Sequence, residues 1–80
     1  MSLTYDPRYN IAYIRFAAKP AEVQTLQIGD ELNIDIAPDG RVCGIELVNA
    51  SAQLSAEDEG RLIVQNDAGG WRTEVPLVVQ

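Results

Sequence analysis

Residues 32–48, LNIDIAPDGRVCGIELV, place two alternating apolar runs on either side of Asp39-Gly40. An Asp-Gly pair between such runs is a strong hairpin signal, because glycine accepts the positive φ angle that a tight turn between twisted strands requires. If these two residues form the loop, the pairs on one face of the hairpin are Leu32–Leu47, Ile34–Ile45 and Ile36–Cys43. The stretch therefore predicts a β-hairpin with one fully apolar face.

The opposite face of this hairpin is mostly polar. It carries Asn33, Asp35, Val42, Gly44 and Glu46. The period of two is typical of a sheet with one face in water, and a shift of one residue would bury Asp35 and Glu46. We therefore expect both carboxylates on a solvated sheet face.

Composition favours one small domain over residues 1–80. The chain is 46% hydrophobic, contains no His and has a formal net charge of −6 with only six basic residues. A chain of this length buries only about 60–65% of its unfolded surface, so we expect modest stability unless it oligomerises. Few Lys and Arg residues argue against partners such as nucleic acid or an acidic membrane surface.

Three features predict a cytoplasmic protein. The single Cys43 cannot form an internal disulfide, which fits a reducing compartment. No apolar run approaches the roughly 20 residues that span a bilayer, and the first five residues, MSLTY, lack the basic and apolar regions of a signal peptide.

The segments around the central hairpin predict further strands. Before it, we expect strands at residues 3–5, 11–16 and 22–28. In residues 11–16, Ala12, Ile14 and Phe16 alternate with Ile11, Tyr13 and Arg15, and we assign the first set to the core. The strand at 22–28 is half polar and is expected near a sheet edge.

After the hairpin, residues 55–60, SAEDEG, predict one helical turn with Ser55 as its cap and Gly60 as its end. Residues 61–65 and 71–79 predict a last hairpin. Its shared face would carry Leu62, Val64, Trp71, Thr73, Val75, Leu77 and Val79. The expected fold is mainly β, or α+β if the turn after Ser55 is helical. It is a small antiparallel β-meander of hairpins over residues 1–54, followed by the short turn and a C-terminal hairpin over residues 55–80.

Four short motifs follow one another within residues 4–51. They are YDP at 5–7, YIR at 13–15, NIDIAPDG at 33–40 and GIELVNAS at 44–51. In this order the motifs resemble a family of small bacterial proteins, domain of unknown function 2283. The resemblance implies a small β-rich domain with no assigned activity. Ala12 stands where a larger aliphatic residue is usual, and the chain continues past Ser51, so the extension would cover a partner surface common to the family.

The residue types argue against catalysis. Without His, the commonest general base, the commonest metal ligand and every Ser-His or Cys-His pair are missing. Cys43 is predicted on the apolar face and is therefore expected to be a buried packing residue. Gly69-Gly70 lacks the Lys of a phosphate-binding loop and precedes a strand. We expect a protein that is not an enzyme, with no catalytic residue, cofactor or bound metal.

Asp35 and Glu46 support an alternative function. Divalent ions prefer carboxylate oxygens, and these two residues are diagonal neighbours in the predicted register, near Asp30 and Glu31. The alternative is a small-ligand or divalent-metal-dependent enzyme that uses these carboxylates. The chain does not contain the spaced ligands of a calcium loop, and a solvated sheet face explains the same residues.

Aromatic residues suggest interaction surfaces. Tyr13 lies beside Arg15, a pairing enriched at protein interfaces, whereas Trp71 is expected to plug the small core. The apolar stretch 77–79 on an edge strand would be hidden by pairing with a second copy. We therefore expect a noncatalytic protein-interaction or regulatory module that forms a homodimer, and its acidity favours a basic protein partner.

Overall fold

The computed structural model describes residues 1–77. Its elements are β1 (Ser2–Asp6), β2 (Ile11–Arg15), β3 (Gln24–Gly29), β4 (Leu32–Ile36), β5 (Val42–Val48), α1 (Ala50–Leu54), the 3-10 turn η1 (Asp58–Gly60), β6 (Arg61–Gln65) and β7 (Arg72–Pro76). The predicted mainly β fold with a C-terminal hairpin is confirmed. The predicted continuation of the last strand to Val79 lies outside the described residues.

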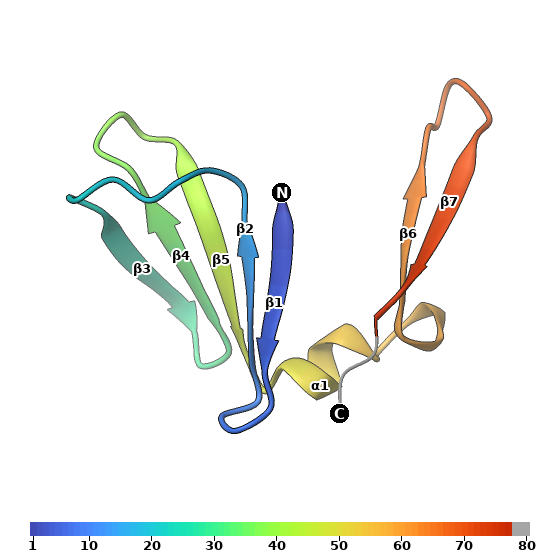
Figure 1. Ribbon diagram of the computed structural model, residues 1–80, viewed down its shortest axis with the longest axis horizontal. Coiled ribbons are helices and arrows are strands. Elements are labelled where there is room, and N and C mark those ends of the chain that lie inside the picture. Colours follow the sequence, from blue (N-terminus) through green and yellow to red (C-terminus); the bar gives the residue numbers. More distant parts are fainter. Residues whose placement is uncertain (78–80) are drawn as a thin grey trace.

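The first five strands form one antiparallel sheet in the order β1-β2-β5-β4-β3, and β6 and β7 form a separate hairpin (Figure 1). Strands β3, β4 and β5 form a meander, but β2 pairs with β5 rather than with β3. The connection between β2 and β3 therefore crosses one end of the sheet. Strand β5, the last of the five in sequence, lies at the centre.

The predicted register of the central hairpin is correct along residues 32–35 and wrong at Ile36. There Ile36 lies opposite Val42 instead of Cys43. A backbone hydrogen bond spans residues 37–41, so the loop is wider than the expected two residues. Cys43 becomes the extra residue of a β-bulge, and it is buried as predicted.

The sheet has one apolar face. Cross-strand partners point to the same side of a sheet, so the register defines a row across all five strands. This apolar row consists of Leu3, Ile14, Ile45, Ile34 and Leu26. We call this side the apolar face. The other side, the polar face, carries Tyr13, Arg15, Thr25, Asn33, Asp35, Gly44 and Glu46.

The fully buried core is small. Among the described residues, the buried apolar ones are Ala12, Cys43 and Ala50. Phe16, which we expected in the core, is 47% exposed, and Trp71, which we expected to plug it, is 54% exposed. Both expectations were wrong because β2 ends at Arg15 and β7 begins at Arg72, which leaves each ring beyond the end of a strand.

The helical turn predicted within residues 55–60 is present as η1 and ends at Gly60, but Ser55 is not its cap and the longer helix α1 was missed. Helix α1 comes before Ser55, whose hydroxyl donates to the carbonyl of Ser51 inside that helix instead of capping a following one. In the segment that was expected to be helical, Asp58 and Glu59 have φ angles of 53° and 55°. Residues 55–60 therefore form a kinked connection. No helix within residues 1–77 is long and apolar enough to cross a membrane.

Candidate functional site

A polar cluster of Tyr13, Lys19, Thr25 and Asp35 lies on the polar face. One oxygen of Asp35 accepts a hydrogen bond of 2.6 Å from the Thr25 hydroxyl. The other accepts a bond of 2.7 Å from the Tyr13 hydroxyl and lies 3.0 Å from Nζ of Lys19. Asp35 is only 7% exposed, so the expected solvated position was wrong. Its burial is tolerated because three donors replace the lost water.

Three separate segments supply these donors. Thr25 lies directly opposite Asp35 on β3, Lys19 comes from the β2–β3 connection, and Tyr13 reaches from β2 across β5. Tyr13 can cross β5 because Gly44 lies in its path, and a Cβ atom there would overlap the tyrosine ring and hydroxyl. Nζ of Lys19 lies 4.9 Å from the centre of the same ring, which adds a cation–π contact.

The pKa shifts in the cluster favour one protonation state. The Thr25 hydrogen bond is the largest cause of a lowered Asp35 pKa, against the opposing effect of burial. The pKa of Lys19 is raised chiefly by its bond to Asp35, and the pKa of Tyr13 is raised chiefly by burial. The cluster is therefore held as a carboxylate, an ammonium and a neutral phenol. None of these shifts moves a group toward titration near neutral pH, which general acid–base catalysis favours.

Glu46 lies diagonally from Asp35, as predicted, because their direct partners are Asn33 and Gly44. Its Oε1 accepts a hydrogen bond of 2.8 Å from the Asn33 side-chain amide. Both candidate carboxylates are thus engaged by donors of the same chain. Across residues 1–77, no three His, Cys, Asp or Glu side chains are arranged to hold a metal ion.

The other candidate residues are not brought together. Tyr13 contacts Asp35 and Lys19 instead of Arg15, which is exposed, and Trp71 belongs to the separate hairpin. Sequence reasoning missed Thr25 and Lys19. Extending the hairpin pairing from the turn at 30–31 would have placed Leu26 opposite Asp35. A register shift between Gln27 and Gly29 brings Thr25 there instead, and nothing local marks Lys19.

A groove separates the apolar face from the C-terminal hairpin, which stands apart from the sheet beyond β1 (Figure 1). Its volume is about 430 Å³, and its lining is Met1, Ser2, Leu3, Ile14, Phe16, Leu54, Leu62, Val75 and Leu77. None of these side chains is charged. On the hairpin, Leu62, Val64 and Val75 are each 41% exposed. The apolar face of the sheet and the apolar face of the hairpin thus line opposite sides of a groove that stays open.

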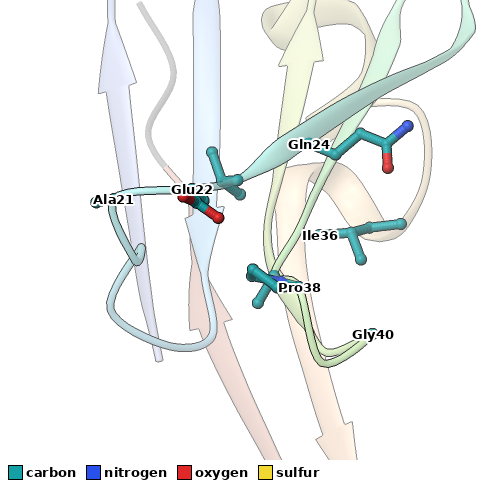
Figure 2. A pocket seen from close by; sticks show the side chains of 8 residues that line it. Ala21, Glu22, Gln24, Ile36, Pro38 and Gly40 are labelled. Atoms are coloured by element: carbon teal, nitrogen blue, oxygen red, sulfur yellow. The ribbon is translucent and has the colours of Figure 1, made fainter.

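A second depression lies between the β2–β3 connection and the β4–β5 loop (Figure 2). Its lining consists of residues 21–24, residues 36–38 and Gly40, with Glu22 as the ionisable group. None of the candidate site residues Tyr13, Arg15, Asp35, Glu46 and Trp71 lines it. The depression therefore adds no chemistry to the polar cluster.

Comparison with known proteins places the chain in a family. The model of DUF2283, a protein family of unknown function, matches residues 2–51. The chain belongs to this family. No curated protein and no solved structure matches it. The matched region contains the whole sheet and the polar cluster, whereas the hairpin side of the groove lies outside it.

Proposed function

We propose that this protein is a noncatalytic interaction module that associates with a second copy of itself through the apolar face and the groove. The observation that carries the proposal is the apolar row across the sheet. Its members Ile14, Ile34 and Ile45 are only half-buried, although they lie in the three central strands. Central strands of a stable domain normally bury their apolar face, so a partner that covers this row supplies the missing core.

The size of the surface supports this proposal. The structure exposes 5838 Å², whereas a compact monomer of 8.8 kDa exposes about 4,800 Å². Its radius of gyration is 14.1 Å, against about 11.6 Å for a compact chain of this length. The excess surface of about 1,000 Å² is close to the roughly 800 Å² that each partner buries in a standard interface.

The polar cluster supports a noncatalytic role, because the carboxylates of Asp35 and Glu46 are engaged by donors of the same chain. The formal charge of −6 favours a basic protein as a further, regulated partner of the dimer. The lone Cys43 is buried, which suits a cytoplasmic setting in which thiols stay reduced.

The test is the solution mass over a concentration series, measured by sedimentation and light scattering. We expect a dimer. Substituting Phe16→Ser, in the groove, should raise the dimer dissociation constant at least about tenfold, because a half-buried ring leaves the interface. Tyr9→Ser is the matched control, since Tyr9 is 69% exposed and lies outside the groove. A monomer at about 1 mM, where even weak pairs form, would rule out the proposal.

A further inference from the structure

We infer that the dimer forms by exchange of hairpins, so that the β6–β7 hairpin of each copy covers the β5–β4–β3 part of the other copy's apolar face. This rests on the self-association proposed above and states which surfaces meet. Residues 55–60, which join α1 to β6, serve as the hinge.

The two surfaces match in chemistry. The register of the hairpin puts Leu62, Val64, Thr73 and Val75 on one face, and none of them is charged. The charged residues Arg72 and Glu74, which pair at 3.2 Å, both alternate to the opposite face of the hairpin. On the sheet, the matching part of the row is Leu26, Ile34 and Ile45. Their contact would remove apolar surface from water and bury no charge.

The path of the chain keeps the hairpin away from that part of its own sheet. Helix α1 follows β5 and is anchored beside β2, where the amide of Ala50 donates to the carbonyl of Asn10 at 3.0 Å. The hairpin then emerges beyond β1 (Figure 1). It shares the groove with Leu3, Ile14 and Phe16, whereas residues of β3, β4 and β5 are not among the groove lining. The hairpin of a second copy can therefore cover the apolar face over β3, β4 and β5.

The hinge carries backbone strain that exchange would release. Asp58, Glu59 and Gly60 have consecutive φ angles of 53°, 55° and 73°. The left-handed region is disfavoured for residues with a side chain. This conformation is held by short local bonds, among them the Gly60 amide to the Glu57 carbonyl at 3.1 Å. An extended hinge needs no positive φ, so opening it favours the exchanged dimer.

The first experiment disrupts each surface separately in the full chain. Leu62→Asp alters the hairpin face, and Leu26→Asp alters the sheet face at an edge strand. Each variant alone should raise the dimer dissociation constant more than tenfold. The matched controls are Gln65→Asp and Gln27→Asp, which change exposed side chains on the opposite faces and should leave the constant within threefold.

Mixing the two variants gives the decisive result. A heterodimer of Leu62→Asp with Leu26→Asp keeps one intact hairpin on one intact sheet, so heterodimers should exceed both homodimers in native mass spectrometry. If Leu62→Asp dimerises like the wild type, or if mixing gives no enrichment, exchange is wrong while self-association stands. A wild-type chain that stays monomeric overturns both proposals.

A hinge variant tests the same inference without touching either surface. Glu59→Gly removes the strain of the closed hinge, so it should weaken the dimer about tenfold, with two hinges acting per dimer. Glu57→Gly is the control, because Glu57 has an extended φ of −133°. A dissociation constant that is the same for both variants would contradict hinge opening, even if Leu26→Asp failed to fold.

Discussion

Tyr13 and Gly44 act as one unit at the residue scale. The tyrosine ring lies in the space that a side chain at position 44 would take, and this position lets its hydroxyl meet Asp35. A glycine in a central strand normally weakens a sheet, because it adds backbone freedom and packs nothing. Here the ring of a neighbouring strand supplies the missing packing.

Gly44→Ala should therefore destabilise the protein by about 1–3 kcal/mol, because the new methyl group displaces Tyr13 from its 2.7 Å bond with Asp35. Chemical denaturation measures the effect. Gly29→Ala is the control, since a Cβ atom at position 29 meets nothing within 4 Å. In a Tyr13→Ala background, Gly44→Ala should destabilise the protein less. An unchanged destabilisation would show that the clash between the methyl group and the Tyr13 ring is unimportant.

Asp35 predicts a dependence of stability on acid. Its pKa is lowered in the folded state from an ordinary 3.8, so the unfolded state takes up its proton first. The contribution of the carboxylate is therefore complete above about pH 5 and disappears as the pH falls through the lowered value. The difference in unfolding free energy between wild type and Asp35→Asn should shrink below about pH 4.

Glu22→Gln is the comparison for this pH series, because Glu22 is an exposed carboxylate outside the cluster. The difference in unfolding free energy between Glu22→Gln and the wild type should vary much less with pH. If the Asp35→Asn difference stays constant down to pH 2, about two units below the ordinary value, the cluster does not stabilise the charged carboxylate.

The sequence predicted which face of the sheet carries Asp35 but not its burial. Alternation assigns a side chain to a face, and both faces of a sheet can be covered. Asp35 is covered by Tyr13, which depends on the unpredicted pairing of β2 with β5, and by Lys19 from an irregular connection. Such long-range contacts leave no local pattern in the chain.

At the scale of elements, Asn10 joins the β1–β2 turn to α1. Its Oδ1 accepts hydrogen bonds from the Ser51 amide at 2.9 Å and the Tyr5 hydroxyl at 3.0 Å. Its Nδ2 donates to the Ser51 hydroxyl at 3.0 Å. Asn10 also has a positive φ of 54°, a conformation that asparagine tolerates better than most residues. One side chain thus fixes both the turn and the start of the helix.

Two substitutions separate these roles of Asn10. Asn10→Gly keeps the positive φ and loses the side-chain bonds, so it should cost about 1–2 kcal/mol in thermal or chemical unfolding. Asn10→Ala should cost about 1 kcal/mol more, because alanine resists the left-handed backbone. Equal costs would show that the backbone conformation contributes nothing.

Element boundaries followed the sequence where turn chemistry was strong. Asp39-Gly40 predicted the hairpin, but the bulge at Cys43 was missed because Val42, which lies opposite Ile36 in its place, is also apolar. Ser55 was taken as an N-cap because acidic residues and Gly60 follow it. Its hydroxyl instead bonds back to Ser51, and a serine has equal capacity for either bond.

At the scale of the whole molecule, the charge distribution predicts how association responds to salt. The groove and the apolar row contain no charged side chain among the residues that define them. The dimer dissociation constant should therefore change less than about threefold between about 0.05 and 0.5 M NaCl, since screening acts on charges. Sedimentation in both salts measures it. Dissociation at high salt would point to an ionic interface instead.

The place of β5 at the centre of the sheet has a consequence for biosynthesis. Until residue 48 has left the ribosome, the strand pairs β1–β2 and β3–β4 lack the strand that joins them in the sheet. Because this middle strand is synthesised last of the five, we expect the nascent sheet to form late, through contacts between distant parts of the chain. Residues 50–77 follow β5 in the sequence, so they are synthesised while the apolar row of the new sheet is still uncovered. If the proposed dimer forms, we expect it to begin forming on polysomes, where nascent copies are neighbours.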